Sequence, residues 1–209
     1  PCEISYRTPA LARAFSRKRV AHAARAKQER GSLMALYTPA YQPTGEEIAV
    51  IKTSKGTIRV QLAGKDAPST WATSLSWLEG FYDNLKFHRY VPGFVIQGGC
   101  PNTRDLTSEE VIAKAGNPFA GLGTGGPGYC IKQEYTTNPN NHHADAALAM
   151  ARSQNPDSAG SQFYLCLGAQ PMLDSGYTVF GQTIEGKDVI AQLRVGDVIE
   201  GIEIENAAE

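Results

Sequence analysis

The sequence lacks any apolar run near the roughly 20 residues that a membrane-spanning helix needs. It has four cysteines, and no two of them form a CxxC pair or another spacing typical of a zinc site. They are Cys2, Cys100, Cys130 and Cys166. These absences exclude a helical membrane span within these residues and a cysteine-based zinc domain, and nothing in the spacing requires a disulfide.

The sequence also lacks an overall charge of one sign, because 20 Lys and Arg face 21 Asp and Glu. The charges are unevenly spread: residues 1–33 hold eight of the basic residues and two of the acidic ones. From Met34 onward 12 bases stand against 19 acids, a net charge of −7. Nucleic-acid binding requires clustered Lys and Arg. We therefore expect the main domain to bind neither nucleic acid nor membranes, and we expect the protein to be cytoplasmic.

Residues 1–45 are interpreted as a basic extension and linker, which is either a disordered tail, a basic arm for an anionic partner, or sequence upstream of a start at Met34. A disordered tail is the default for a charged terminal segment. Composition becomes ordinary directly after Met34, so we hypothesise that translation begins there; N-terminal sequencing of the native protein tests this. Residues 46–205 form the expected domain, and 206–209 a short tail.

From Glu46 onward the pattern favours short β-strands separated by turn residues. The expected strands cover 48–53, 57–62, 87–91, 94–97, 128–131, 147–151, 163–167, 178–183 and 198–204. Two amphipathic helices are expected, one with Trp71, Leu75, Leu78 and Tyr82 on one face and one at 187–193. Cys100–Gly128 is expected to be a surface loop with a helical turn at 107–114. This composition predicts a closed β-barrel with covered ends.

The hairpin at 87–99 is the first candidate site. Its two strands meet at a Pro92-Gly93 turn, which brings the Arg89 guanidinium near an apolar patch. Alternation along the second strand predicts that Phe94 and Ile96 face one way, and Val95 and Gln97 the other. A fixed cation beside an apolar floor suits a ligand with an apolar ring and a polarisable carbonyl. For this stretch alone, a buried hairpin with a surface arginine is the simpler interpretation.

A second stretch, residues 148–168, reads LAMARSQNPDSAGSQFYLCLG and is followed by Met-Leu-Asp at 172–174 and YTVFG at 177–181. Together with the hairpin, this stretch resembles the cyclophilin family of peptidyl-prolyl cis/trans isomerases over residues 46–205. The resemblance implies an eight-stranded antiparallel β-barrel with a helix at each end. It also implies catalysed rotation about X-Pro bonds, assistance to protein folding, and no cofactor or metal.

The resemblance assigns roles to eleven residues. Arg89, Phe94 and Gln97 would be catalytic. The substrate-binding residues would be Val95, Ala151, Arg152, Gln162, Tyr164, Met172, Leu173 and Tyr177. Phe94, Val95, Tyr164 and Leu173 would line a proline pocket with Met172 at its rim. Gln97 would orient Arg89, Gln162 would support Gln97, and the backbone of Ala151-Arg152 would pair with the peptide.

Four positions depart from the best-known eukaryotic pattern and look like those of bacterial cyclophilins. Met172 stands where tryptophan is usual, so we expect binding of the cyclic peptide cyclosporin to be weakened. Tyr177 replaces a histidine, Arg152 an asparagine and Tyr164 a phenylalanine. None of these changes removes Arg89.

Other motifs fit competing functions poorly. Gly121–Gly126 matches GxGxxG, but no βαβ unit surrounds it, so a dinucleotide site is not expected. Ser161 lacks the GxSxG context of a hydrolase nucleophile. The adjacent His142 and His143 are expected in a solvated loop, and His88 is expected to make a hydrogen bond in the core.

Two functions from different classes follow. The first is an active isomerase, expected to be a monomer, acting on proline in unfolded or flexible polypeptides. The second is a non-catalytic module on the same fold that binds proline-containing segments. Arg89 separates them, since a binding module could dispense with it, and it favours the enzyme.

Overall fold

The computed structural model describes residue 36 and residues 43–73 and 80–206, with the side chains of 71–79 outside the description. These residues belong to one compact unit, Leu36–Glu209. The basic segment 1–33, the start proposed at Met34, and Cys2 lie outside the described residues. Three cysteines, Cys100, Cys130 and Cys166, are free and buried.

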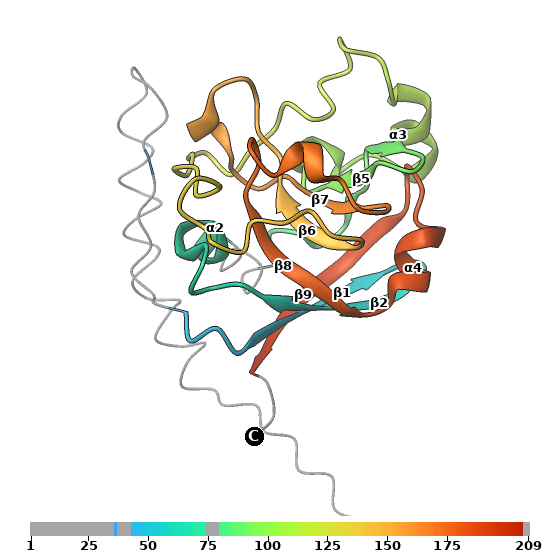
Figure 1. Cartoon of the computed structure of the whole chain (residues 1–209). Helices are drawn as coiled ribbons and strands as arrows, with labels where there is room; N and C mark the ends of the chain where they lie inside the picture. Colours follow the sequence, from blue (N-terminus) through green and yellow to red (C-terminus); the bar gives the residue numbers. More distant parts are fainter. Residues whose placement is uncertain (1–35, 37–42, 74–79, 207–209) are drawn as a thin grey trace, which may run out of the picture. The chain divides into compact units, whose positions relative to one another are not determined.

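One curled antiparallel sheet dominates the fold (Figure 1). Its strands are β1 (Glu47–Thr53), β2 (Gly56–Leu62), β3 (Leu85–Lys86), β4 (Arg89–Val91), β5 (Val95–Gly98), β6 (Ala147–Met150), β7 (Phe163–Cys166), β8 (Val179–Glu185) and β9 (Val198–Asn206). They lie in the order β3-β9-β1-β2-β8-β6-β7-β5-β4. The mainly β fold predicted from the sequence is confirmed. The strand expected at 128–131 is wrong, because Cys130 and Ile131 form only isolated bridges.

The two ends of the sheet belong to one continuous run, residues 85–91. Its first part, β3, pairs with β9, and the Phe87 N–H donates to the Asp197 carbonyl at 2.9 Å. Its second part, β4, pairs with β5, and the His88 N–H donates to the Gln97 carbonyl at 3.0 Å. The run therefore closes the barrel. The nine assigned strands reduce to the expected eight when this run is counted once.

Short helices accompany the barrel: α2 (Pro68–Thr73), α3 (Ser108–Lys114) and α4 (Lys187–Gln192), with 3-10 turns η2 (Pro101–Thr103), η3 (Pro156–Ser158) and η4 (Pro171–Leu173). In Figure 1, α2 and α4 lie on opposite sides of the sheet. Ile190 of α4 and the following Leu193 are buried in the core, as the helical spacing predicted. The helical turn expected at 107–114 is also confirmed, with Thr107 and Glu110 forming a capping box.

The start of α2 is stabilised from a distance. The buried Glu134 carboxylate accepts the backbone N–H groups of Ser69 and Thr70 at 2.9 and 2.8 Å. A carboxylate is favourable at the unpaired N–H groups of a helix start. Asp66, which precedes the helix, accepts a hydrogen bond from Asn140 Nδ2 at 2.9 Å. Of the four residues expected on one face of this helix, Tyr82 is buried but lies in a turn and not in α2, so the expectation is wrong there; the other three side chains lie outside the described residues.

Two apolar clusters divide the molecule. The larger fills the barrel and includes Ile58, Phe87, Ile96, Phe163 and Phe180, each 1% exposed or less. The smaller, the outer apolar cluster, lies on the other face of β5, β6 and β7, because alternate side chains of a strand point to opposite faces. It consists of Val95, Ala147, Ala149, Tyr164, Cys166 and Val179.

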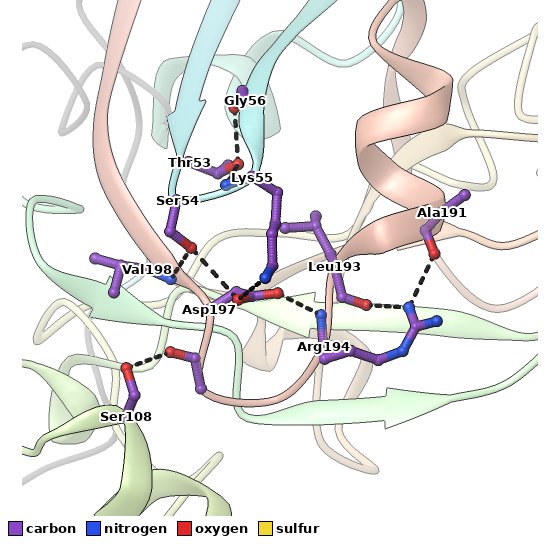
Figure 2. Close-up of polar contacts among 11 residues, drawn as sticks. Thr53, Ser54, Lys55, Gly56, Ser108, Ala191, Leu193, Arg194, Asp197 and Val198 are labelled. Carbon is purple, nitrogen blue, oxygen red and sulfur yellow. Dashed lines mark hydrogen bonds and ion pairs between the residues drawn. The ribbon is translucent and has the colours of Figure 1, made fainter.

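The loop between α4 and β9 is held by a dense polar network (Figure 2). Arg194 Nη1 donates to the carbonyls of Ala191 and Leu193 at 2.9 and 2.7 Å. Asp197 accepts the Arg194 N–H at 2.7 Å and pairs with Lys55 at 3.5 Å. This network contacts one side of the hairpin, since the Arg194 guanidinium carbon lies 4.6 Å from the centroid of the Tyr90 ring.

Candidate active site

Arg89 and Phe94 come together across the turn between β4 and β5. The turn is tight, with Gly93 at φ 68° and the Phe94 N–H donating to the Val91 carbonyl at 3.0 Å. The Arg89 guanidinium carbon lies 6.0 Å from the centroid of the Phe94 ring, and the residue is exposed. Among the described residues, the guanidinium has no hydrogen-bond or ion-pair partner. The turn therefore presents a free cation beside an aromatic ring, as expected.

The expected alternation at Phe94 is wrong. Phe94 precedes β5 and still belongs to the turn, so it does not follow the strand's period. It packs with Val95 against the outer apolar cluster, whereas Ile96 points into the barrel core. The departure matters for the site, because it adds an aromatic ring to the face that carries Arg89.

A pair of amides lies beside Arg89. Gln97 is opposite Arg89 in the register of β4 and β5, and its Nε2 donates to Gln162 Oε1 at 3.0 Å. Gln162 Nε2 in turn donates to the carbonyls of Gly123 and Gly125, both at 2.8 Å. The glycine-rich loop thus serves as an acceptor platform for Gln162. A side chain at Gly125 would come within 2.7 Å of the Asn102 amide oxygen, which explains the glycine there.

The outer apolar cluster forms the floor of the site. Phe94, Ala151, Leu173 and Tyr177 pack against it. The ring of Tyr177 meets that of Tyr164 edge-on, with centroids 6.0 Å apart. Six of the eleven predicted site residues therefore belong to one contiguous apolar cluster, whose surface is formed by its four partly buried members, because Val95 and Tyr164 are only 2% and 4% exposed. The six residues are Phe94, Val95, Ala151, Tyr164, Leu173 and Tyr177.

Arg152 and Met172 lie at the margins of this surface. The Arg152 guanidinium stacks on Tyr177 at 4.7 Å and donates to the carbonyls of Gly176 and Ser153 at 2.7 and 2.8 Å. Met172 lies in η4 next to Leu173 and is 71% exposed. Arg152 therefore holds the loop at Gly176 in place, and Met172 lies exposed at the edge of the apolar surface.

His143 was expected in a solvated loop, and this is wrong, because its side chain is fully buried. Its Nδ1 lies 2.8 Å from Asp174 Oδ1 and its Nε2 lies 2.9 Å from the Tyr164 hydroxyl. Its neighbour His142 is 77% exposed, as expected. One signal could have revealed the buried histidine: tyrosine at position 164 adds a hydroxyl to a core position, and a buried hydroxyl needs a partner.

His88 is buried and its backbone N–H donates to the Gln97 carbonyl at 3.0 Å, whereas neither ring nitrogen has a hydrogen-bond partner among the described residues. A side chain at Gly123 would come within 3.4 Å of its Nε2, so the ring faces the glycine loop beside Gln162. Burial lowers the pKa of His88 to about 4; the nearby Gln162 side chain opposes this shift and the Arg89 charge adds to it. His88 is therefore neutral at neutral pH.

Comparison with known proteins agrees with this architecture. The sequence model of the family "Cyclophilin type peptidyl-prolyl cis-trans isomerase/CLD" matches residues 48–208. A peptidyl-prolyl cis-trans isomerase of Synechococcus elongatus is 42% identical over 159 residues, which is 75% of this chain and 94% of that protein. Peptidyl-prolyl cis-trans isomerase B of Bacillus subtilis is 40% identical over 149 residues, 71% of this chain and 90% of that protein.

Solved structures of cyclophilin-type isomerases share this fold. A cyclophilin-type isomerase of Cryptosporidium parvum superposes with a TM-score of 0.62 at 25% identity, over 77% of this chain and 98% of that one. A second structure of it, obtained in the presence of the dipeptide Ala-Pro, gives a TM-score of 0.59. The family match and the fold thus place the chain among the barrel isomerases. The chain belongs to the cyclophilin-type peptidyl-prolyl cis-trans isomerases, a family that acts on proline-containing peptides.

Proposed function

We propose that this isomerase turns over X-Pro bonds by directing the Arg89 guanidinium at the proline nitrogen while the bond twists. Amide resonance gives the bond a rotation barrier of about 18–20 kcal/mol. In the twisted state resonance is lost, and the nitrogen becomes pyramidal with a lone pair that accepts a hydrogen bond. A donor fixed at that lone pair favours the twisted state over both planar states, which accelerates rotation.

The observation that carries this proposal is the state of Arg89. It is exposed, it lies over Phe94, and its donors are uncommitted among the described residues. Arginine stays charged at all physiological pH values and offers several donors in a fixed plane. A free, oriented guanidinium beside an apolar surface is what this chemistry requires.

The outer cluster would hold the proline ring. Phe94 and Leu173 would supply apolar surface next to Arg89, with the buried Val95 and Tyr164 in the layer beneath and Met172 at the rim. Burial of a proline ring there draws on the hydrophobic effect, while the carbonyl side of the bond faces the amides. Gln97, fixed by Gln162, would orient Arg89 and meet a substrate carbonyl.

The peptide backbone would add to the site as an extended strand beside Ala151 and Arg152. The Ala151 N–H already donates to the Gln162 carbonyl at 2.9 Å. The substrate backbone would therefore pair with the backbone of Arg152. This residue lies outside the strands, and its backbone has no hydrogen bond to the backbone of another described residue. Its side chain would keep the neighbouring loop in place through Gly176.

The substrates we propose are proline-containing segments of unfolded or flexible polypeptides, because an extended backbone must lie across the surface. We propose that the protein acts as a monomer in the cytoplasm and needs no cofactor, since rotation transfers neither protons nor electrons. We also propose that cyclosporin binds weakly, because Met172 offers a thioether where a tryptophan would offer a wide indole; titration with the inhibitor tests this.

A module that binds proline segments without turning them over is the competing function. It would need the apolar surface but would gain nothing from an uncommitted cation. The relatives named above as isomerases match this chain in sequence along most of their length. Arg89 thus favours catalysis over binding alone.

The test is a protease-coupled assay on a short proline peptide with Arg89→Ala beside Arg194→Ala. Removing a donor used in the transition state lowers kcat/KM by about two or more powers of ten. Arg194→Ala removes an arginine from the other aromatic ring of the same hairpin and should leave kcat/KM within about twofold, since its donors are bound to carbonyls at the C-terminal end of α4. Near-normal activity of Arg89→Ala would refute the assignment.

A further inference from the structure

A chain of three side chains runs beneath the apolar floor of the site. The His143 side chain is fully buried, and its ring lies nearly parallel to that of Tyr164, with an interplanar angle of 12° and centroids 6.0 Å apart. Asp174 Oδ1 accepts from His143 twice, through the backbone N–H at 2.7 Å and through Nδ1 at 2.8 Å. His143 Nε2 lies 2.9 Å from the Tyr164 hydroxyl oxygen.

The partners determine the direction of each hydrogen bond. An ionised carboxylate only accepts, so the His143 Nδ1 carries a proton and donates it to Asp174. Nε2 of the neutral ring then accepts, and the Tyr164 hydroxyl donates to it. Burial lowers the pKa of His143, and burial raises the pKa of Tyr164, so both groups stay neutral near pH 7.

The chain connects two sides of the site. Tyr164 belongs to β7 and its ring is part of the floor. Asp174 directly follows η4, which carries Met172 and Leu173. Asn141 adds a parallel link, because its amide donates to the carbonyls of Asp174 and Tyr177 at 2.6 and 3.0 Å. A shift of either side would therefore break buried hydrogen bonds.

We propose that His143 and Asp174 are positioning residues that hold the Tyr164 ring and the Pro171–Leu173 turn at the spacing a substrate proline ring requires. The inference rests on the proposed function of this surface. Neither residue needs to touch the substrate: His143 is covered, and Asp174 acts through it. Positioning by these two residues strengthens binding of the ground state and of the transition state equally. Its loss should therefore raise KM and the peptide Kd and leave kcat unchanged.

The experiment is a double-mutant cycle on Tyr164→Phe and His143→Leu, with peptide Kd from NMR titration and kcat from exchange of a short proline peptide. Each single variant leaves a buried polar group without its partner, so we expect Kd and KM to rise about threefold to tenfold, with kcat changed less than about twofold. In the double variant both partners are apolar, so the rise should not exceed that of the larger single variant. Effects that multiply, or that fall on kcat, would overturn the proposal.

Two further variants keep the test decisive if His143→Leu does not fold. Asp174→Ala removes the other end of the chain from a partly exposed position and should raise Kd in the same direction. His142→Ala is the matched control, because this exposed neighbour reaches Asp174 Oδ2 at 3.5 Å but is not a partner of Tyr164; its Kd should stay within about twofold. Equal effects of Asp174→Ala and His142→Ala would contradict positioning through His143.

A spectroscopic readout separates this inference from the proposed function. The nitrogen resonances of His143 should show a protonated Nδ1 and an accepting Nε2, and Tyr164→Phe should shift Nε2. A protonated Nε2 in the native protein would overturn the assignment. If Arg89→Ala retained turnover, the catalytic proposal for Arg89 would fail. The peptide Kd values of the double-mutant cycle would still decide whether His143 and Asp174 position Tyr164.

Discussion

Two arginines lie against aromatic rings of one hairpin, and they differ in what their donors do. The Arg194 guanidinium carbon lies 4.6 Å from the centroid of the Tyr90 ring. Its Nη1 donates to the carbonyls of Ala191 in α4 and Leu193 directly after α4, at 2.9 and 2.7 Å (Figure 2). Arg89 lies over Phe94 at 6.0 Å and has no partner among the described residues. Arg89 and Tyr90 are consecutive in β4, so their side chains point to opposite faces.

The comparison shows how one structural motif serves two purposes. On the Tyr90 side, the cation fastens the loop between α4 and β9, and its hydrogen bonds contribute to stability. On the Phe94 side, the same pairing of cation and ring leaves the donors free to meet a ligand. An arginine over a ring therefore indicates function only when its donors have no carbonyl or carboxylate to satisfy.

The largest effect expected from a change that keeps the charge is that of Arg89→Lys. Lysine retains the cation but loses the planar set of donors, and its ammonium is more mobile. We expect kcat to fall about a hundredfold with peptide Kd nearly unchanged. Exchange spectroscopy at saturating peptide measures this. Full activity of Arg89→Lys would show that charge alone suffices and would weaken the contrast with Arg194.

His88, next to Arg89, should make stability depend on pH. Its pKa is about 4 in the folded protein, below the ordinary value of 6.5. The unfolded chain therefore binds a proton between these pH values while the folded protein does not. This contribution to stability is complete above pH 6.5 and falls as pH is lowered towards 4, by about 3 kcal/mol at most. His143 acts in the same direction, since burial lowers its pKa also.

Urea unfolding between pH 7 and 4 measures this dependence, with His88→Gln as the comparison. The variant should lose the part of the slope that His88 contributes and keep the part from His143. A wild-type stability that is flat between pH 6.5 and 4.5 would contradict a buried, neutral His88.

Changing the two rings should separate binding from stability. Phe94→Ala removes apolar surface from the outer cluster, and we expect peptide Kd to rise about tenfold with a modest loss of stability. Tyr90→Ala removes a ring packed against the barrel core, and we expect a loss of about 2 kcal/mol in unfolding free energy with Kd unchanged. Peptide titration and thermal unfolding of both variants check this. The reverse pattern would show that the two faces of the hairpin have been assigned wrongly.

The smallest effect expected is that of deleting residues 1–33. The family match begins at residue 48, and both arginines lie within it. We expect kcat/KM to stay within about twofold, because no proposed contact involves the deleted segment. A large loss would place the basic segment in the site.

Many of the strands and the Arg89 hairpin could be predicted from the sequence, because strand periodicity and turn residues are local signals. The runs at 48–53, 57–62, 163–167 and 198–204 correspond to β1, β2, β7 and β9 within three residues at each end. The Arg89 hairpin was found for the same reason, since Pro92-Gly93 marks its turn. The split of residues 85–91 between two strand partners was not predicted, because pairing at both ends of a sheet is a property of the closed barrel.

What the sequence could not show depends on contacts between distant residues. The start of α2 is stabilised by Glu134, which is 64 or 65 residues away from the N–H groups that it binds. His143 and Asp174 are 31 residues apart. Two adjacent histidines in a polar segment resemble a solvated loop until the fold places a tyrosine hydroxyl beside one of them. Phe94 was predicted on the same face as Ile96 but packs against the outer apolar cluster, because a turn residue does not follow strand alternation.

The measurement that tests the central claim most directly is the cis/trans exchange rate of a proline peptide while it is bound, by NMR exchange at saturating protein, for the native protein and for Arg89→Ala. We predict fast exchange on the native protein and, for Arg89→Ala, exchange slowed by about two or more powers of ten with peptide still bound. Exchange of equal speed on both proteins would contradict the account and show that the apolar surface, without the arginine, turns the bond.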